Sequence, residues 1–222
     1  MAEARFGSEG GDERPPIDAR QTALTKARYD RQAERYDARM ALMERMGARG
    51  WRQRVWQQVV GPAVLEVGVG TGANMPYYPK GAQVTAIDLS DRMVAQARRR
   101  AAREGVDVQL LEMDAQALGF PDESFDSAAG TFVFCSVPDP VRGLREVHRV
   151  LKPGGRLVLL EHVRGPGALG PVFDLLNPLV VRLTGANINR ETVEHVRRAG
   201  FEIEGVSTML FRIVKLVVAR KG

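Results

Sequence analysis

Three alternating glycines that follow an acidic residue form the most informative stretch of the chain. The apolar run 64–67 contains Glu66, and the glycines after it are Gly68, Gly70 and Gly72. A short apolar run that leads into glycines predicts a buried strand feeding a tight turn. Alternate glycines let the backbone approach a ligand closely, at angles that a side chain would hinder. We therefore expect a ligand to bind against this turn.

Two more carboxylates follow apolar runs further along the chain. Asp88 follows the run 84–87, twenty residues after Gly68, and Asp114 follows the run 108–113. The first spacing is typical of a βαβ unit whose second strand places a carboxylate on the hydroxyls of a ribose. An acid after the third run can accept a hydrogen bond from the exocyclic amine of adenine. Together they predict a cofactor that carries a nucleoside.

The glycine pattern alone leaves the identity of this cofactor open. Gly68, Gly70 and Ala73 also satisfy the G-x-G-x-x-G/A pattern of dinucleotide sites, so a nicotinamide or flavin cofactor is an alternative. Glu66 stands where it could reach the ammonium of a methionine moiety, whereas it would repel the pyrophosphate of a dinucleotide. The pattern E-x-G-x-G-x-G, which Gly72 completes, therefore favours S-adenosylmethionine.

Four segments, 66–72, 88–90, 114–126 and 151–155, resemble the class I S-adenosylmethionine-dependent methyltransferases. Within that family they are similar to the branch that contains quinone-biosynthesis methyltransferases and bacterial phospholipid N-methyltransferases. The resemblance covers about residues 25–222 and is more specific for cofactor and fold than for substrate. It implies an α/β fold with a Rossmann-like seven-stranded sheet, mostly parallel with a C-terminal antiparallel hairpin, helices on both faces and an N-terminal helical lid.

The same resemblance implies which residues bind S-adenosylmethionine, and it implies no metal ion. Asp88 is expected at the ribose hydroxyls. Leu89 and Met93 are expected beside the adenine, and Asp114 and Ala115 at the adenine edge. The expected cofactor-binding residues on the methionine side are Glu66, Gly68, Gly70, Gly72 and Thr131.

From residue 63 onward the chain alternates between strand and helix patterns. Such alternation predicts a largely parallel sheet covered by helices on both faces. The last two predicted strands are so close in sequence that they must pair as an antiparallel hairpin. Strands are expected near 63–67, 83–87, 107–113, 126–133, 156–163, 201–207 and 211–219, and helices near 72–78, 90–104, 139–151 and 189–199.

A chain of 222 residues is long enough for one full domain, which we expect over 19–222. Residues 1–18 are rich in glycine, proline and acids and are predicted to be disordered. Residues 20–46 lack proline and glycine and predict one long amphipathic helix, the lid, with Tyr29 and Tyr36 on its apolar stripe. In the resembled family such a helix folds over the cofactor, which would place Tyr36, and with it Tyr29, in the catalytic site. Packing of both rings against the domain is the alternative.

Two further features concern the methyl acceptor. His162 ends the fifth predicted strand, at the edge where ligands of open α/β sheets bind, and could take a proton from an amine that is to be methylated. A histidine that is only hydrogen-bonded at a strand end is the alternative. The insert 166–186 is mostly apolar, which suits a lipid or another apolar substrate.

The charge distribution points to a membrane surface. The net charge of the chain is +5, and residues 20–60 alone hold ten basic and four acidic residues, a balance of +6. A basic helix together with an apolar insert provides both ingredients of reversible binding to an anionic membrane. No run approaches the roughly 18 apolar residues of a membrane span. The single cysteine excludes an internal disulfide. We therefore expect a cytoplasmic protein, peripherally bound to the inner face of the membrane.

The resemblance and these two features favour methylation of the amine of phosphatidylethanolamine and its methylated intermediates, towards phosphatidylcholine. A quinone-biosynthesis C-methyltransferase is the first alternative, and a small-molecule or thiol methyltransferase the next. A nucleic-acid-binding protein or RNA methyltransferase is a further class that the basic helix could suit. We expect no nucleic acid partner, because arginines and aromatic residues are not interleaved on a strand and the N-P-P-[YF] tetrapeptide is missing.

Overall fold

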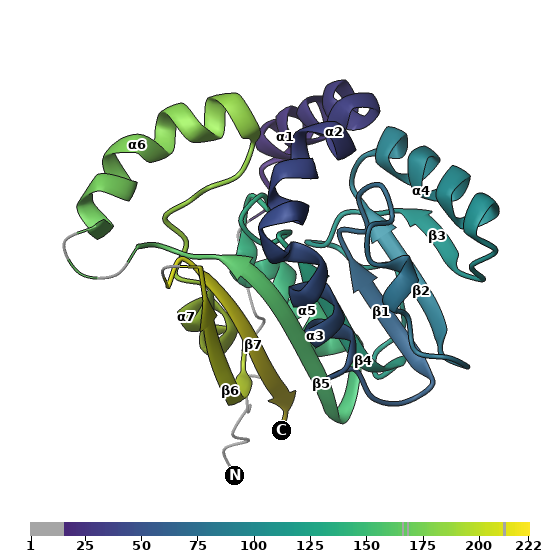
Figure 1. Ribbon diagram of the computed structural model, residues 1–222. Coiled ribbons are helices and arrows are strands. Elements are labelled where there is room, and N and C mark those ends of the chain that lie inside the picture. The colour runs from purple at the N-terminus through teal and green to yellow at the C-terminus, as the bar shows by residue number, and fades with distance from the viewer. Residues whose placement is uncertain (1–15, 166, 168, 211) are drawn as a thin grey trace, which may run out of the picture.

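The structure is a computed structural model that describes residues 16–165, 167, 169–210 and 212–222, so most of the expected disordered segment 1–18 lies outside the described residues. Its centre is a seven-stranded sheet of order β3-β2-β1-β4-β5-β7-β6 (Figure 1). Strands β1 to β5 run parallel, and β7 is antiparallel to both of its neighbours. The strands are β1 (Ala63–Val67), β2 (Gln83–Asp88), β3 (Gln109–Glu112), β4 (Phe125–Thr131), β5 (Leu151–His162), β6 (Phe201–Met209) and β7 (Val214–Lys221). The predicted fold class, including the C-terminal hairpin, is confirmed.

Helices cover both faces of the sheet, as the alternating pattern predicts. Helices α3 and α4 pack on one face and α5 and α7 on the other, each over its own apolar cluster. The helices are α1 (Ala19–Gln32), η1 (Ala33–Arg35), α2 (Tyr36–Met43), η2 (Glu44–Ala48), α3 (Arg49–Trp56), η3 (Met75–Tyr77), α4 (Asp91–Glu104), α5 (Pro140–Val150), α6 (Leu169–Thr184) and α7 (Thr192–Arg198).

Alternation along β1 decides which residues face which helices. Successive side chains of a strand point to opposite faces of the sheet. Leu65 and Val67 belong to the cluster under α5 and α7, whereas Val64 belongs to the cluster under α3 and α4. Glu66 shares the side of Val64, so its carboxylate points towards α3.

The structure corrects the prediction of one long lid helix over 20–46. Helix α1 ends at Gln32, a short 3₁₀ turn follows, and α2 begins at Tyr36. Ala33 in that turn is buried against the domain. Absence of proline and glycine permits a continuous helix but does not enforce one, because tertiary packing overrides weak local propensity. Helices α1 and α2 together are called the lid below.

Two other segments differ from expectation. The helix predicted at 72–78 is only the 3₁₀ turn η3, since Tyr78 precedes a proline and has an extended backbone. The apolar insert 166–186 instead contains a helix of 16 residues, α6, with Pro178 inside it. Helix α6 lies with α1 and α2 at one end of the molecule (Figure 1).

The turn after β4 is held by a buried carboxylate. Glu161 of β5 is fully buried and accepts hydrogen bonds from the backbone N–H groups of Val133 (2.9 Å), Phe134 (2.8 Å) and Cys135 (3.4 Å). Burial raises the pKa of Glu161 to about 7, against the effect of these donors. Buried amides of a tight turn need such an acceptor, so Glu161 determines the path of the chain from β4 to α5.

We predict that Glu161→Ala lowers the free energy of unfolding by about 3 kcal/mol, because it leaves three buried amides without their acceptor. Urea denaturation followed by circular dichroism measures this loss. Glu191→Ala, at an exposed position, is the matched control and should change the free energy by less than about 0.5 kcal/mol. A loss below about 1 kcal/mol for Glu161→Ala would contradict the role of this carboxylate.

Candidate functional site

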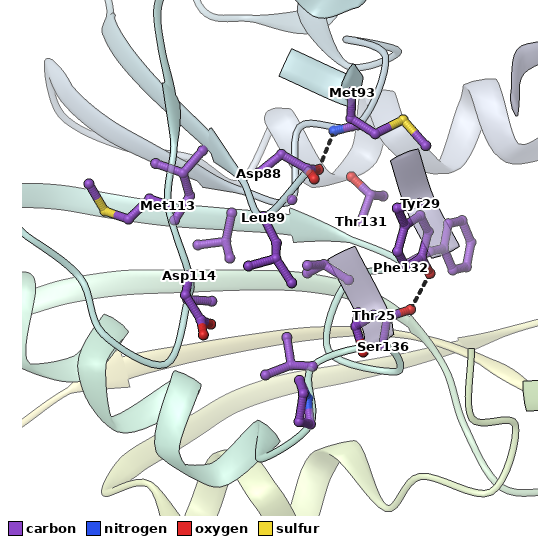
Figure 2. Close-up of a pocket in the computed structure, with 18 of the residues that line it drawn as sticks. Thr25, Tyr29, Asp88, Leu89, Met93, Met113, Asp114, Thr131, Phe132 and Ser136 are labelled. Atoms are coloured by element: carbon purple, nitrogen blue, oxygen red, sulfur yellow. Dashed lines mark hydrogen bonds between the residues drawn. The ribbon is translucent and has the colours of Figure 1, made fainter. Parts of the chain in front are cut away.

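A cavity opens at the carboxyl ends of β1, β2 and β4 and is covered by the lid. This edge is where open α/β sheets bind their ligands. Ten of the thirteen predicted site residues line it, and Figure 2 labels several of them. The three that do not are Glu66, Gly72 and His162.

Asp88 lies at the end of β2 with both carboxylate oxygens held by the backbone. Oδ2 accepts from the N–H of Gly70 and Oδ1 from the N–H of Ser90, each at 2.9 Å. Burial raises the pKa of Asp88 to about 6, and the two amides oppose that shift. Each oxygen keeps a lone pair for a further donor, so the carboxylate can accept hydrogen bonds from a pair of ribose hydroxyls.

Beside Asp88 the cavity lining is apolar except for one carboxylate (Figure 2). Leu89 lies between β2 and α4, Met93 comes from the first turn of α4, and Met113 follows β3. Asp114 and Ala115 complete the wall, and Asp114 accepts from the backbone N–H of Gln116 at 2.9 Å. Apolar faces with a single carboxylate at the edge suit a nucleobase that carries an exocyclic amine.

The glycine turn needs glycine for a steric reason. Gly68 has φ +71°, and a Cβ there would lie 2.3 Å from Cγ2 of Val133. Gly70 also has a positive φ and donates to Asp88. Gly72, outside the cavity lining, has φ +85°, and a Cβ there would meet the side chain of Met75 at 2.8 Å. At Gly68 and Gly70 the turn therefore lines the cavity with backbone atoms alone. Gly72 lets the chain pass close to the side chain of Met75.

Glu66 lies behind the cavity wall. It is fully buried, and burial raises its pKa to about 7. Its carboxylate accepts from the amide nitrogen of Asn74 at 2.5 Å and from the hydroxyl of Tyr78. Thr131, which does line the cavity, accepts from the same amide nitrogen at 2.5 Å. Binding of the methionine ammonium by Glu66 stays a prediction.

The lid places both tyrosines in the cavity wall, with Thr25 beside them. The ring centroids of Tyr29 and Tyr36 are 6.5 Å apart, and the hydroxyl of Tyr29 is hydrogen-bonded to Ser136 (Figure 2). Burial raises the pKa of Tyr36 to about 12 and that of Tyr29 well above its usual value. Both rings are therefore neutral at physiological pH.

The aspartates next to the tyrosines attach the lid to the domain. Asp30 accepts from the hydroxyl of Ser90 at 2.5 Å. Asp37 accepts from the hydroxyl of Thr71 at 2.5 Å and from Arg100 at 2.7 Å. In the sequence each of these aspartates directly follows a lid tyrosine, a repeat that does not reveal which residues they contact.

His162 lies under α6 and outside the cavity lining. Its ring stacks on Phe173 with centroids 5.9 Å apart, and among the described residues its Nδ1 atom has no hydrogen-bond partner. Burial lowers the pKa of His162. A part in proton transfer stays a prediction. Ser136, which contacts Tyr29 in the cavity, was missed by sequence reasoning.

The described residues form no recognisable metal site. No group of three or more histidine, cysteine, aspartate or glutamate side chains among them is arranged to hold a metal ion. Cys135 is buried, and burial raises the pKa of its thiol far above the usual range, so the reactive thiolate is disfavoured.

Comparison with known proteins finds a family described as a methyltransferase domain, which matches residues 65–159. A demethylmenaquinone methyltransferase from Thermus thermophilus is 37% identical over 71% of this chain and 74% of that protein. A phosphatidylethanolamine N-methyltransferase from Cereibacter sphaeroides is 43% identical, over 50% of this chain and 57% of that protein. A thiol S-methyltransferase from Rattus norvegicus is 33% identical over 62% of this chain and 59% of that protein.

A solved structure extends the likeness to almost the whole described fold. A methyltransferase from Thermotoga maritima, described as S-adenosylmethionine-dependent and as a possible histamine N-methyltransferase, superimposes with a TM-score of 0.67 at 25% identity. The match covers 88% of this chain and 99% of that one. The cofactor is therefore S-adenosylmethionine, and the cavity fits it: a slot for adenine, a carboxylate for ribose and bare backbone at β1. A dinucleotide is no longer an alternative.

We predict that Asp88→Asn weakens binding of both S-adenosylhomocysteine and 5′-methylthioadenosine by about tenfold, since both ligands carry the ribose hydroxyls. Isothermal titration calorimetry measures both affinities. Only the ionised carboxylate can accept a ribose hydrogen bond with each of its two oxygens, and burial raises the pKa of Asp88 to about 6. The wild-type affinity for 5′-methylthioadenosine should therefore fall as the pH is lowered from 7.5 to 5.5.

Two controls make this prediction specific. Asp91→Asn changes an exposed carboxylate on the first turn of α4 and should leave both affinities unchanged. In Asp88→Asn the fall of 5′-methylthioadenosine affinity at low pH should disappear. Unchanged affinities of Asp88→Asn for both ligands would contradict binding of the ribose hydroxyls by Asp88.

Proposed function

We propose, from the premise that this chain belongs to the S-adenosylmethionine-dependent methyltransferase family, that its acceptor is the amine of phosphatidylethanolamine and of its methylated intermediates. The observation that carries the proposal is an exposed apolar helix face at the same end of the molecule as the cofactor cavity. The 43% identity to a phosphatidylethanolamine N-methyltransferase supports the choice of acceptor.

The exposed face belongs to α6. Val172, Leu175, Leu176 and Leu179 recur at helical spacing along one stripe, and Leu175 is 80% exposed. A contiguous apolar stripe in water marks an interaction surface rather than a solvated one. Because α6 lies beside the lid (Figure 1), a lipid layer that covered it would bring lipid headgroups near the cavity.

The lid adds positive charge to this end. Arg31, Arg35 and Arg39 are exposed on α1, η1 and α2, and the exposed side chains of Leu24 and Leu42 flank them in sequence. Arginines attract anionic headgroups, while the leucines enter the interfacial region. This supports reversible attachment to an anionic membrane. No helix among the described residues is both long and apolar enough to cross a bilayer.

The two lid tyrosines suit an amine acceptor. Their rings are neutral, and the face of an aromatic ring stabilises an ammonium or methylated ammonium group. When bound, S-adenosylmethionine supplies a methyl group that its sulfonium activates for in-line displacement. The residues of this chain then hold the acceptor in line and exclude water. Besides these tyrosines, the only ionisable side chains of the described lining are Asp88 and Asp114, both on the nucleoside side, so the amine proton leaves to solvent at the mouth.

A second candidate acceptor is the ring carbon of a demethylated quinol. The demethylmenaquinone methyltransferase from Thermus thermophilus matches more of this chain than the phospholipid enzyme does. Phe132, Val133 and Val137 in the cavity wall could pack against an aromatic ring. A prenylated quinol is also carried in the membrane, so the apolar face of α6 serves both candidates.

We predict that the purified protein transfers labelled methyl groups from S-adenosylmethionine to vesicles of phosphatidylethanolamine mixed with an anionic phospholipid. Parallel vesicles carry demethylmenaquinol in phosphatidylcholine. Thin-layer separation of the labelled lipids identifies the acceptor. Label in the quinone alone would replace the leading proposal by the second candidate, and label in neither lipid would refute both.

We predict that the double change Leu175→Asp and Leu179→Asp weakens vesicle binding by about tenfold or more, because charged groups would enter the interfacial region. Lipid methylation falls with it, while the affinity for S-adenosylhomocysteine stays within about twofold. Vesicle flotation and calorimetry measure the two quantities. Val60→Asp, at an exposed apolar residue just before β1 and hence near the opposite edge of the sheet, is the control. Equal vesicle binding by all variants would contradict a membrane role for α6.

A further inference from the structure

A buried polar network behind the cavity wall has no part in the function described so far. Asn74 and Arg52 are both buried, and neither lines the cavity. They lie between Glu44, at the end of the lid, and the pair formed by Glu66 and Thr131 at the ends of β1 and β4. Polar groups away from water require a reason, because each costs free energy unless it is fully paired.

Charges on both sides determine how the amide of Asn74 is oriented. Its Nδ2 atom donates to Glu66 Oε1 and to Thr131 Oγ1, both at 2.5 Å, and its Oδ1 atom accepts from Arg52 Nη1 at 2.9 Å. The opposite orientation would set oxygen against the carboxylate and nitrogen against the guanidinium. Asn74 is therefore held in one orientation, with its donor towards the cavity wall.

Arg52 is itself fixed by Glu44, which directly follows the lid. Its Nε and Nη2 atoms donate to Glu44 Oε1 at 3.0 and 2.9 Å. Glu44 begins the segment η2 directly after α2, and Arg52 lies in α3. A continuous chain of hydrogen bonds thus runs from the end of the lid to Thr131 in the cavity wall.

The order of the strands tells which part of the cofactor lies at Thr131. The sheet runs β3-β2-β1-β4, with Asp114 after β3 and Asp88 at the end of β2. With adenine at the first carboxylate and ribose at the second, the remaining amino-acid end lies over β1 and β4, where Thr131 ends the strand.

We propose that Asn74 is a positioning residue for the amino-acid end of the cofactor, with Arg52 holding its amide in place. Because Thr131 Oγ1 accepts a hydrogen bond from Asn74, the O–H of Thr131 is free to donate a hydrogen bond to the cofactor carboxylate. Glu66, held by the same amide, attracts the cofactor ammonium from behind the wall. The inference needs the cofactor but not the lipid acceptor.

The electrostatics of Glu66 agree with this role. Four groups face it: Tyr78 and Asn74 donate to it, Arg52 attracts its charge, and Asp88 opposes it. Arg52 is already paired with Glu44, so a cation at the cavity wall adds the missing compensation. With a pKa of about 7 before the cation arrives, Glu66 loses a proton when an ammonium binds. Affinity for an ammonium-bearing ligand should therefore fall as the pH drops through 7.

Two ligands separate positioning from general damage. S-adenosylhomocysteine carries the amino-acid end, whereas 5′-methylthioadenosine has the same nucleoside without it. Asn74→Leu keeps a similar side-chain volume. In calorimetry it should lower the affinity for S-adenosylhomocysteine by about tenfold and change the affinity for 5′-methylthioadenosine by less than about twofold. Asn189→Leu, where the amide donates to Asp174 at the surface, is the matched control. Equal losses for both ligands, or no loss, would overturn the proposal.

A second variant and a pH series decide the case if Asn74→Leu does not fold. Arg52→Lys keeps the positive charge but loses the planar guanidinium that binds two partners at once. It should lower the affinity for S-adenosylhomocysteine by about threefold and leave the affinity for 5′-methylthioadenosine unchanged. In the wild type the ratio of the two affinities should decline between pH 8 and pH 6, and in Glu66→Gln it should be constant. A constant ratio in the wild type would overturn the inference. Since no acceptor is present in these assays, the lipid proposal can fail independently.

Discussion

The carboxylate of Asp88, held by the backbone amides of Gly70 and Ser90, is the constraint on which the site depends. One amide belongs to the turn after β1 and the other to the start of α4, so a single buried side chain ties three segments together. Ser90 also caps α4 and donates to Asp30 of the lid. The nucleoside slot and its cover thus share one anchor, which a methyltransferase needs because it must position two partners without residual water.

The lid has two different sides, one with exposed arginines and one with tyrosines and aspartates that contact the domain, although its sequence predicts a single basic helix. Part of the positive charge of this region is already paired: Lys26 pairs with Glu112 near the surface, and Arg52, just beyond the lid, pairs with Glu44. Arg31, Arg35 and Arg39 are exposed, whereas Arg28 is half-buried. Meanwhile the tyrosines turn inward and their neighbouring aspartates bind the domain. The lid therefore has an exposed basic side, which the proposed membrane attachment would use, and an inner side that encloses the cavity.

Both proposed acceptors are membrane lipids, and the exposed apolar stripe of α6 would serve either of them. Helix α6 projects beside the lid with its apolar stripe exposed. Three residues of α6 contact the domain: Asp174 pairs with Arg164, Asn177 is hydrogen-bonded to Asn187 and Ile188, and Phe173 stacks on His162. The exposed leucines of the stripe make none of these contacts, so that face of α6 can meet another surface while these contacts persist.

Local patterns in the sequence determined the sheet, the hairpin and the positions of Asp88 and Asp114, because strand alternation, glycine turns and strand-end acids act within a few residues. The strand β1 lies where it was expected. Tertiary packing alone decided that the lid breaks into two helices and that Glu66 meets Asn74 behind the wall. It also placed His162 under an unpredicted helix. These outcomes depend on contacts between distant segments, whose energies no local pattern of residues records.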